Sequence, residues 1–84
     1  MSTSALPLRF LDYTVLGPGG DVLGKVLIDL RESYPRRRLV VEHGHWLLRR
    51  SIVVPHAHIV SVDTGRRTLR LDLNRAQLRQ MPAW

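Results

Sequence analysis

Four histidines are the residues best suited to bind a metal ion, and they form two His-x-His pairs, His43 with His45 and His56 with His58. Alternate side chains share a face in extended backbone, so each pair could offer two imidazoles to zinc or nickel. A metal site needs three or four converging ligands, and one straight strand over 46–54 would hold the pairs roughly 30 Å apart. Only a split strand or a second subunit would bring the two pairs together, and we expect polar turn histidines and no cofactor.

Arginine supplies nearly all of the positive charge, because Lys25 is the only lysine among 13 basic residues and the net charge is +6. The planar guanidinium suits phosphate and carboxylate groups, so an acidic partner is physically attractive. Ordinary surface solvation is the alternative explanation. The candidate partner- or anion-binding residues in this set are Arg36, Arg37, Arg38, Arg49, Arg50, Arg66 and Arg67.

Catalytic patterns are missing from the sequence. The chain has no cysteine, its serines do not stand in a nucleophile-elbow context, and its seven carboxylates are scattered singly. The glycine-rich segment 17–20 lacks the Lys-Ser/Thr ending of a phosphate loop, so it predicts a turn. We predict no catalytic residues and no enzyme activity.

The two tryptophans have different expected roles. Trp46 lies in an apolar stretch and is expected in the core, whereas Trp84 follows Pro82. Trp84 could pack back on the domain or dock to a partner, and the sequence does not decide between these.

The length of 84 residues fits one domain, which we place at 10–84 behind a short tail at 1–9. No apolar run approaches the ~20 residues of a membrane-spanning helix, and the N-terminal segment lacks the features of a signal peptide. Together with the absence of cysteine, this leads us to expect a cytoplasmic protein.

Hydrophobic alternation and turn residues predict an all-β fold with about six short strands. The segment 46–54 could form one strand or two pieces split at 49–51, and we favour two. Asn74 and Gln77 match a helix cap, and Pro82 ends the helical turn. Gly24 is expected at a bulge or a close backbone contact. The expected strands are 11–16, 22–30, 38–42, 46–54, 58–62 and 68–73.

Several ordered segments resemble the PRC-barrel family, which is named for the photosynthetic reaction centre H subunit and also occurs in a ribosome-maturation factor. The resemblance implies a small six-stranded antiparallel barrel with a short C-terminal helical turn. It also implies a role in assembly and protein interaction, without a shared reaction or fixed ligand residues. The segments are Gly20-Asp21-x-Leu23-Gly24-Lys25-Val26 with Asp29-Leu30, Ile52-Val53-Val54-Pro55 with Ile59, and Leu71 to Leu78 with Pro82.

Two functional hypotheses follow from the residues and the resemblance. The first is a non-enzymatic module that stabilises or scaffolds a protein complex, with self-association as one form, through its arginine loops and an exposed strand edge. The second is a basic RNA- or ribosome-associated module that contacts phosphate without reading sequence.

Overall fold

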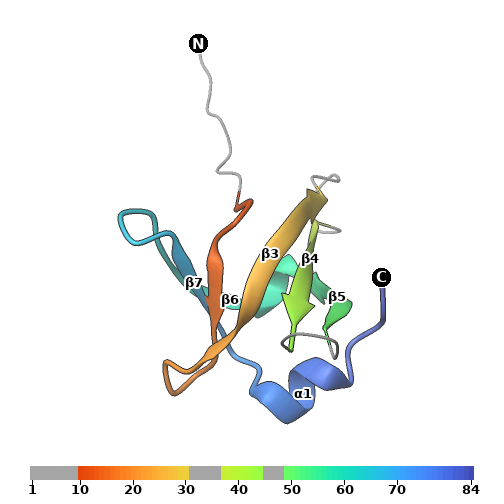
Figure 1. Ribbon diagram of the computed structural model, residues 1–84. Coiled ribbons are helices and arrows are strands. Elements are labelled where there is room, and N and C mark those ends of the chain that lie inside the picture. The colour runs from red at the N-terminus through yellow and green to blue at the C-terminus, as the bar shows by residue number, and fades with distance from the viewer. Residues whose placement is uncertain (1–9, 31–36, 45–48) are drawn as a thin grey trace.

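The computed structural model describes residues 10–30, 37–44 and 49–84, so the expected tail at 1–9 lies outside the described residues. This part of the chain is mostly β, with a six-stranded sheet and one short α-helix (Figure 1). The elements are β2 (Thr14–Leu16), β3 (Val22–Leu30), β4 (Arg38–His43), β5 (Arg50–Pro55), the 3-10 helix η2 (His56–His58), β6 (Ile59–Asp63), β7 (Thr68–Leu71) and α1 (Arg75–Arg79).

The sheet is mixed, with the strand order β5-β4-β3-β2-β7-β6. Neighbours pair antiparallel except β2 and β7, which run parallel with Thr14 beside Thr68. The expectation of a purely antiparallel sheet is therefore wrong at this pair. Hairpin connections impose antiparallel pairing on strands that follow each other directly, but β2 and β7 are distant in sequence and no hairpin sets their direction.

Among the described strands, β5 and β6 stand at the two ends of this order and no ladder joins them to each other. The expected closure into a barrel is therefore not confirmed. The 3-10 helix η2 connects these two edge strands directly, because it lies between Pro55 and Ile59.

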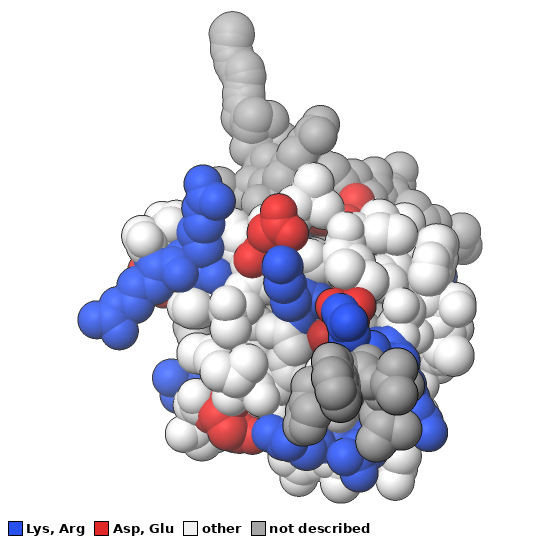
Figure 2. Space-filling view, viewed as in Figure 1, with Lys and Arg blue, Asp and Glu red and all other residues white. Residues whose placement is uncertain are grey.

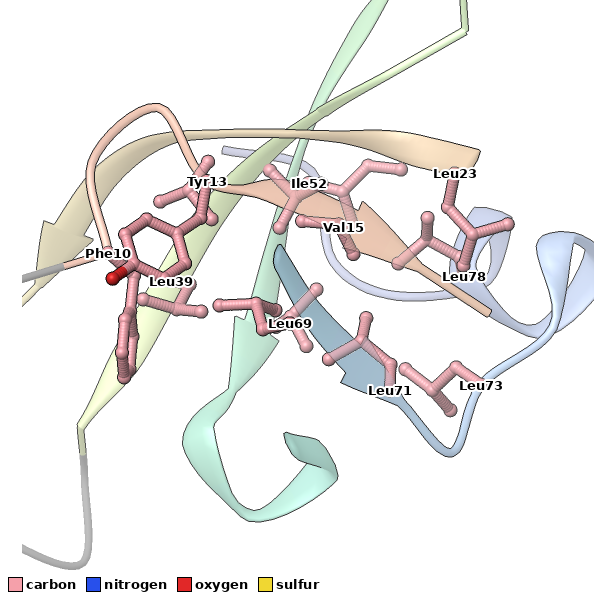
Figure 3. Close-up of a cluster of buried hydrophobic side chains, with 13 residues drawn as sticks. Phe10, Tyr13, Val15, Leu23, Leu39, Ile52, Leu69, Leu71, Leu73 and Leu78 are labelled. Atoms are coloured by element: carbon pink, nitrogen blue, oxygen red, sulfur yellow. The ribbon is translucent and has the colours of Figure 1, made fainter. Parts of the chain in front are cut away.

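The core lies on the inner side of the curled sheet, where side chains from strands and from α1 meet (Figure 3). Leu69 and Leu71 of β7 point inward while Arg70 between them is exposed, as the alternation predicts. Leu78 of α1 is fully buried against the strands. The cluster comprises Phe10, Tyr13, Val15, Leu23, Val26, Leu39, Val41, Ile52, Val54, Leu69, Leu71, Leu73 and Leu78.

Gly24 allows β3 and β4 to approach closely. A Cβ at this position would overlap the backbone oxygen of Glu42, so the close contact expected at Gly24 is observed. Gly24 also borders a register shift in the β2–β3 ladder, because Val15 pairs with Gly24 whereas Leu16 pairs with Val22. A second shift in β3 lies between Val26 and Ile28. Any larger residue at Gly24 would push the two strands apart.

The helix α1 begins at the predicted cap. The Gln77 amide donates to Asn74 Oδ1 at 2.8 Å, and the Asn74 amide donates to Gln77 Oε1 at 2.8 Å. This reciprocal pair satisfies two amides at the helix start. It places Leu78 over the end of the core and directs the following residues toward β5, against which α1 packs.

No helix in the described residues is long and apolar enough to cross a membrane.

Candidate functional site: the two edges of the sheet

β6 is an edge strand with an exposed apolar surface. Its Val60 and Val62 side chains are 59% and 38% exposed, and none of the described strands pairs with its outer side. Val60 has no partner residue in the β7 register, which shifts between Ile59 and Ser61. The strand therefore presents apolar side chains beside backbone groups that can form a further ladder.

A shallow groove of about 500 Å³ runs beside β6, and we call it the edge groove. Its two arginines already have partners within the protein. The Arg66 guanidinium lies near Asp63, with Nε 3.9 Å from Oδ2, and Arg70 Nη1 donates to the Pro18 carbonyl at 3.3 Å. The lining residues are Leu16, Ser61, Val62, Asp63, Thr64, Arg66, Thr68 and Arg70.

At the other edge, the C-terminal segment runs antiparallel to β5. Ala83 lies opposite Ile52, the Val53 amide donates to the Pro82 carbonyl at 2.8 Å, and the Trp84 amide donates to the Ser51 carbonyl at 2.9 Å. These bonds occupy outward-facing backbone groups of β5. The edge is therefore covered by the chain itself.

Beside this segment lies a second groove, of about 450 Å³, which we call the terminal groove. Two exposed arginines, Arg50 from β5 and Arg79 from α1, line it together with the Trp84 side chain, which is 61% exposed. Trp84 thus packs back through its backbone while its ring stays accessible. The lining residues are Arg50, Ser51, Ile52, Arg79, Met81, Ala83 and Trp84.

The predicted arginines lie in different parts of the fold. Arg37 and Arg38 stand at the start of β4, Arg49 and Arg50 at the start of β5, and Arg66 and Arg67 in the β6–β7 turn; Arg36 lies outside the described residues. Figure 2 shows basic side chains in separate groups, with acidic side chains between the groups. Basic groups lie at the left and along the lower edge, where α1 lies in Figure 1. Of the predicted arginines that the structure describes, Arg50 alone lines the terminal groove, where Arg79 joins it.

Arg37 belongs to a partly buried cluster where β3 ends and β4 begins. Its Nη2 lies 3.1 Å from Asp29 Oδ2, and the Asp29 side chain is only 2% exposed. The Phe10 amide donates to the same carboxylate oxygen at 3.2 Å, and the Arg37 guanidinium lies over the Phe10 ring. This ion pair joins three segments of the chain, so Arg37 has a structural contact in place of an open anion site.

His56 stacks on Phe10 in the same cluster, with ring centroids 5.7 Å apart. Its Nε2 is buried without a hydrogen-bond partner in the described residues. Burial lowers the pKa of His56 below its ordinary value of 6.5, and the Arg37 charge lowers it further, while Asp29 opposes the shift. The neutral imidazole is therefore the form that fits this position.

The described histidines do not assemble a metal site. His43 is buried, and its Nδ1 lies 2.6 Å from the Leu23 carbonyl oxygen, to which it donates, while His58 Nδ1 lies 2.8 Å from Asp72 Oδ1. His43 pairs with Arg50 in the β4–β5 ladder, whereas His56 follows the other end of β5, roughly 20 Å from Arg50 at ~3.3 Å per residue.

The 56–58 segment is a 3-10 helix, so the extended geometry that would align His56 with His58 is absent. His45 lies outside the described residues, as does Trp46. Among the residues that are described, no group of three or more His, Cys, Asp or Glu side chains is arranged to hold a metal ion.

No protein-family model matches the chain, and no curated protein matches it either.

Proposed function

We propose that this protein is a non-enzymatic binding module that adds an extended segment of a partner protein to the outer edge of β6. The observation that carries the proposal is the position of β6 at the end of the sheet, with Val60 and Val62 exposed. Adding a strand to an edge gives affinity through backbone hydrogen bonds and specificity through alternate side chains.

The resemblance to the PRC-barrel family supports the same proposal, since it implies a role in assembly. We include in the proposal that the sheet is a PRC-type barrel left open between β5 and β6. The landmarks that carry the resemblance, such as Gly24, Pro55 and Asn74, lie at a close strand contact, a strand end and a helix cap. These residues stabilise the scaffold and do not contact a partner in this proposal. The choice of partner then depends on the edge strand β6.

Charge favours an acidic partner over a second copy of the chain. The net charge of +6 makes two copies repel each other, whereas an acidic segment would be attracted. The proposed occupant is therefore an extended segment with apolar residues at alternate positions and flanking carboxylates.

A displayed library of linear peptides, selected on the whole protein, tests this function. We expect the selected peptides to be acidic with alternating apolar residues, and to slow amide hydrogen exchange in β6. A Val60→Lys change should weaken their binding by about tenfold or more, because it places a charge in the new interface. Val22→Lys is the matched control, since Val22 on β3 is 60% exposed and lies away from β6.

Equal loss of binding in both variants, or protection of a different strand, would contradict the proposal. Light scattering of the free protein tests the alternative occupant. A dimer that Val60→Lys dissociates and Val22→Lys leaves intact would show that a second copy takes the edge instead.

A further inference from the structure

We propose that the terminal groove binds single-stranded nucleic acid, with one base stacked on Trp84 and neighbouring phosphates held by Arg50 and Arg79. This inference concerns the opposite edge of the sheet from the proposed protein-binding strand. The sequence led us to expect phosphate contact in the arginine loops. The proposal places this contact at one site with defined residues instead.

Two arginine side chains of the terminal groove lack partners among the described residues. Neither the Arg50 nor the Arg79 side chain forms a hydrogen bond, an ion pair or a ring contact in the described part of the chain, and both are exposed. Other arginines are engaged: Arg75 Nη2, for example, lies 3.6 Å from Asp21 Oδ2. Among the described residues that line the terminal groove there is also no Asp or Glu. Within the described part of the chain, two cations therefore face this groove without an anion beside them, which suits a ligand that carries phosphate.

The indole of Trp84 is accessible in this groove. Trp84 is 61% exposed, and its indole makes no ring contact within the described residues. Its backbone is nevertheless held by the hydrogen bond from its amide to the Ser51 carbonyl. The indole ring is exposed while the backbone that carries it is held in place, so the ring can act as a platform on which a base stacks. Stacking does not depend on the identity of the base, because every base has a π-face.

The groups that the terminal groove offers favour nucleic acid over peptide as its ligand. A peptide that docks on a strand edge needs unpaired backbone groups, but the Val53 amide and Ser51 carbonyl of β5 are already bonded to the C-terminal segment. What this groove offers is side chains: two guanidinium groups, an indole and the Met81 side chain. Stacking and arginine–phosphate pairing require no backbone edge, so single-stranded nucleic acid fits the groove better than an extended peptide does.

Fluorescence anisotropy of a labelled single-stranded oligouridylate of about 10 nucleotides tests the proposal on the whole protein. Trp84→Ala should weaken binding by about fivefold or more, and Trp84→Phe should retain most of it because it keeps a ring. Arg50→Gln and Arg79→Gln should each reduce the slope of log affinity against log salt by about 0.7, the value for one phosphate contact in a single strand.

Arg67→Gln is the matched control, because Arg67 is also exposed and also lacks a side-chain partner in the described residues, but lies in the β6–β7 turn. It removes the same charge and should leave the affinity and the salt slope close to those of the unchanged protein. An equal effect of Arg50→Gln and Arg67→Gln would mean attraction by net charge alone and would overturn the site.

Intrinsic fluorescence reports on stacking independently of charge. A Trp46→Phe variant leaves Trp84 as the only tryptophan, so its emission comes from the groove alone. We expect the oligouridylate to quench this emission and inorganic phosphate to leave it unchanged. Absence of quenching at saturating oligonucleotide, absence of binding at low salt, or displacement of the oligonucleotide by an acidic peptide would each refute the proposal.

Discussion

β5 carries the C-terminal segment of its own chain along its outer side, whereas β6 has no strand there in the described part of the protein. The arginine side chains beside these two strands differ as well. Beside β6 the groove arginines Arg66 and Arg70 are paired internally, whereas beside β5 the side chains of Arg50 and Arg79 have no partner among the described residues. One edge offers backbone and apolar side chains, and the other offers charge and an indole.

This difference shows how one small sheet can present two kinds of surface. Covering an edge with the chain's own segment removes it from strand addition, which is also a route to aggregation. The cover then becomes a support for side chains, as Trp84 illustrates. An uncovered edge keeps the capacity for strand addition, and the two edges can therefore act independently.

The largest effect is expected from a change that loosens α1, the helix that directs the C-terminal segment along β5. Leu78 is fully buried and holds α1 against the core, so Leu78→Ala should lower the free energy of unfolding by about 2–5 kcal/mol. Urea denaturation measures this loss. Leu27→Ala is the control, because Leu27 is 39% exposed and should change stability by only about 0.5 kcal/mol. Similar losses in both variants would contradict the role of Leu78.

A smaller effect is expected when the cover itself is removed. A variant that ends at Met81 loses the two backbone hydrogen bonds to Val53 and Ser51, which should cost about 1–3 kcal/mol. The Val53 amide should exchange faster with solvent, and the variant should self-associate more at high concentration because β5 becomes an open edge. Unchanged exchange at Val53 would show that the segment does not protect β5.

The smallest effect on stability is expected at η2, which connects the two edge strands β5 and β6. Because the pKa of His56 is lowered in the folded protein, the unfolded chain takes up the proton first as pH falls through 6.5. The contribution of His56 to stability is therefore fully present above this pH and decreases as the pH falls toward the lower pKa of the folded state. His56→Phe keeps an aromatic ring beside Phe10 and should remove this pH dependence in urea titrations. A variant with an unaltered pH profile would rule out His56 as its source.

Local chemistry made part of the fold predictable. The cap between Asn74 and Gln77, the inward Leu69 and Leu71, and the close contact at Gly24 all depend on neighbours within a few residues or on one strand face. Turn histidines were expected after Pro55, but the sequence did not indicate that they form a 3-10 helix, and the strand expected from residue 58 begins at Ile59 instead.

The candidate sites were less accessible from the sequence. Arg50, Arg79 and Trp84 meet only because α1 directs the C-terminal segment back to β5, and no local pattern indicates that return. The doublet Arg49-Arg50 looks uniform in the sequence. In the structure Arg49 Nη1 lies 3.7 Å from Glu42 Oε2, whereas Arg50 faces the groove. Partner choice by individual arginines depends on strand register, which the sequence alone did not provide.

The parallel pairing of β2 with β7 has a consequence for synthesis of the chain on the ribosome. β2 is made before β3 to β6, but the strand that covers one of its sides is made after them. Until β7 emerges, the nascent hairpin of β2 and β3 has an unpaired edge and an uncovered apolar face, as is typical of contacts between distant parts of a chain. Completion of the sheet is therefore expected to be a late, slow step in folding.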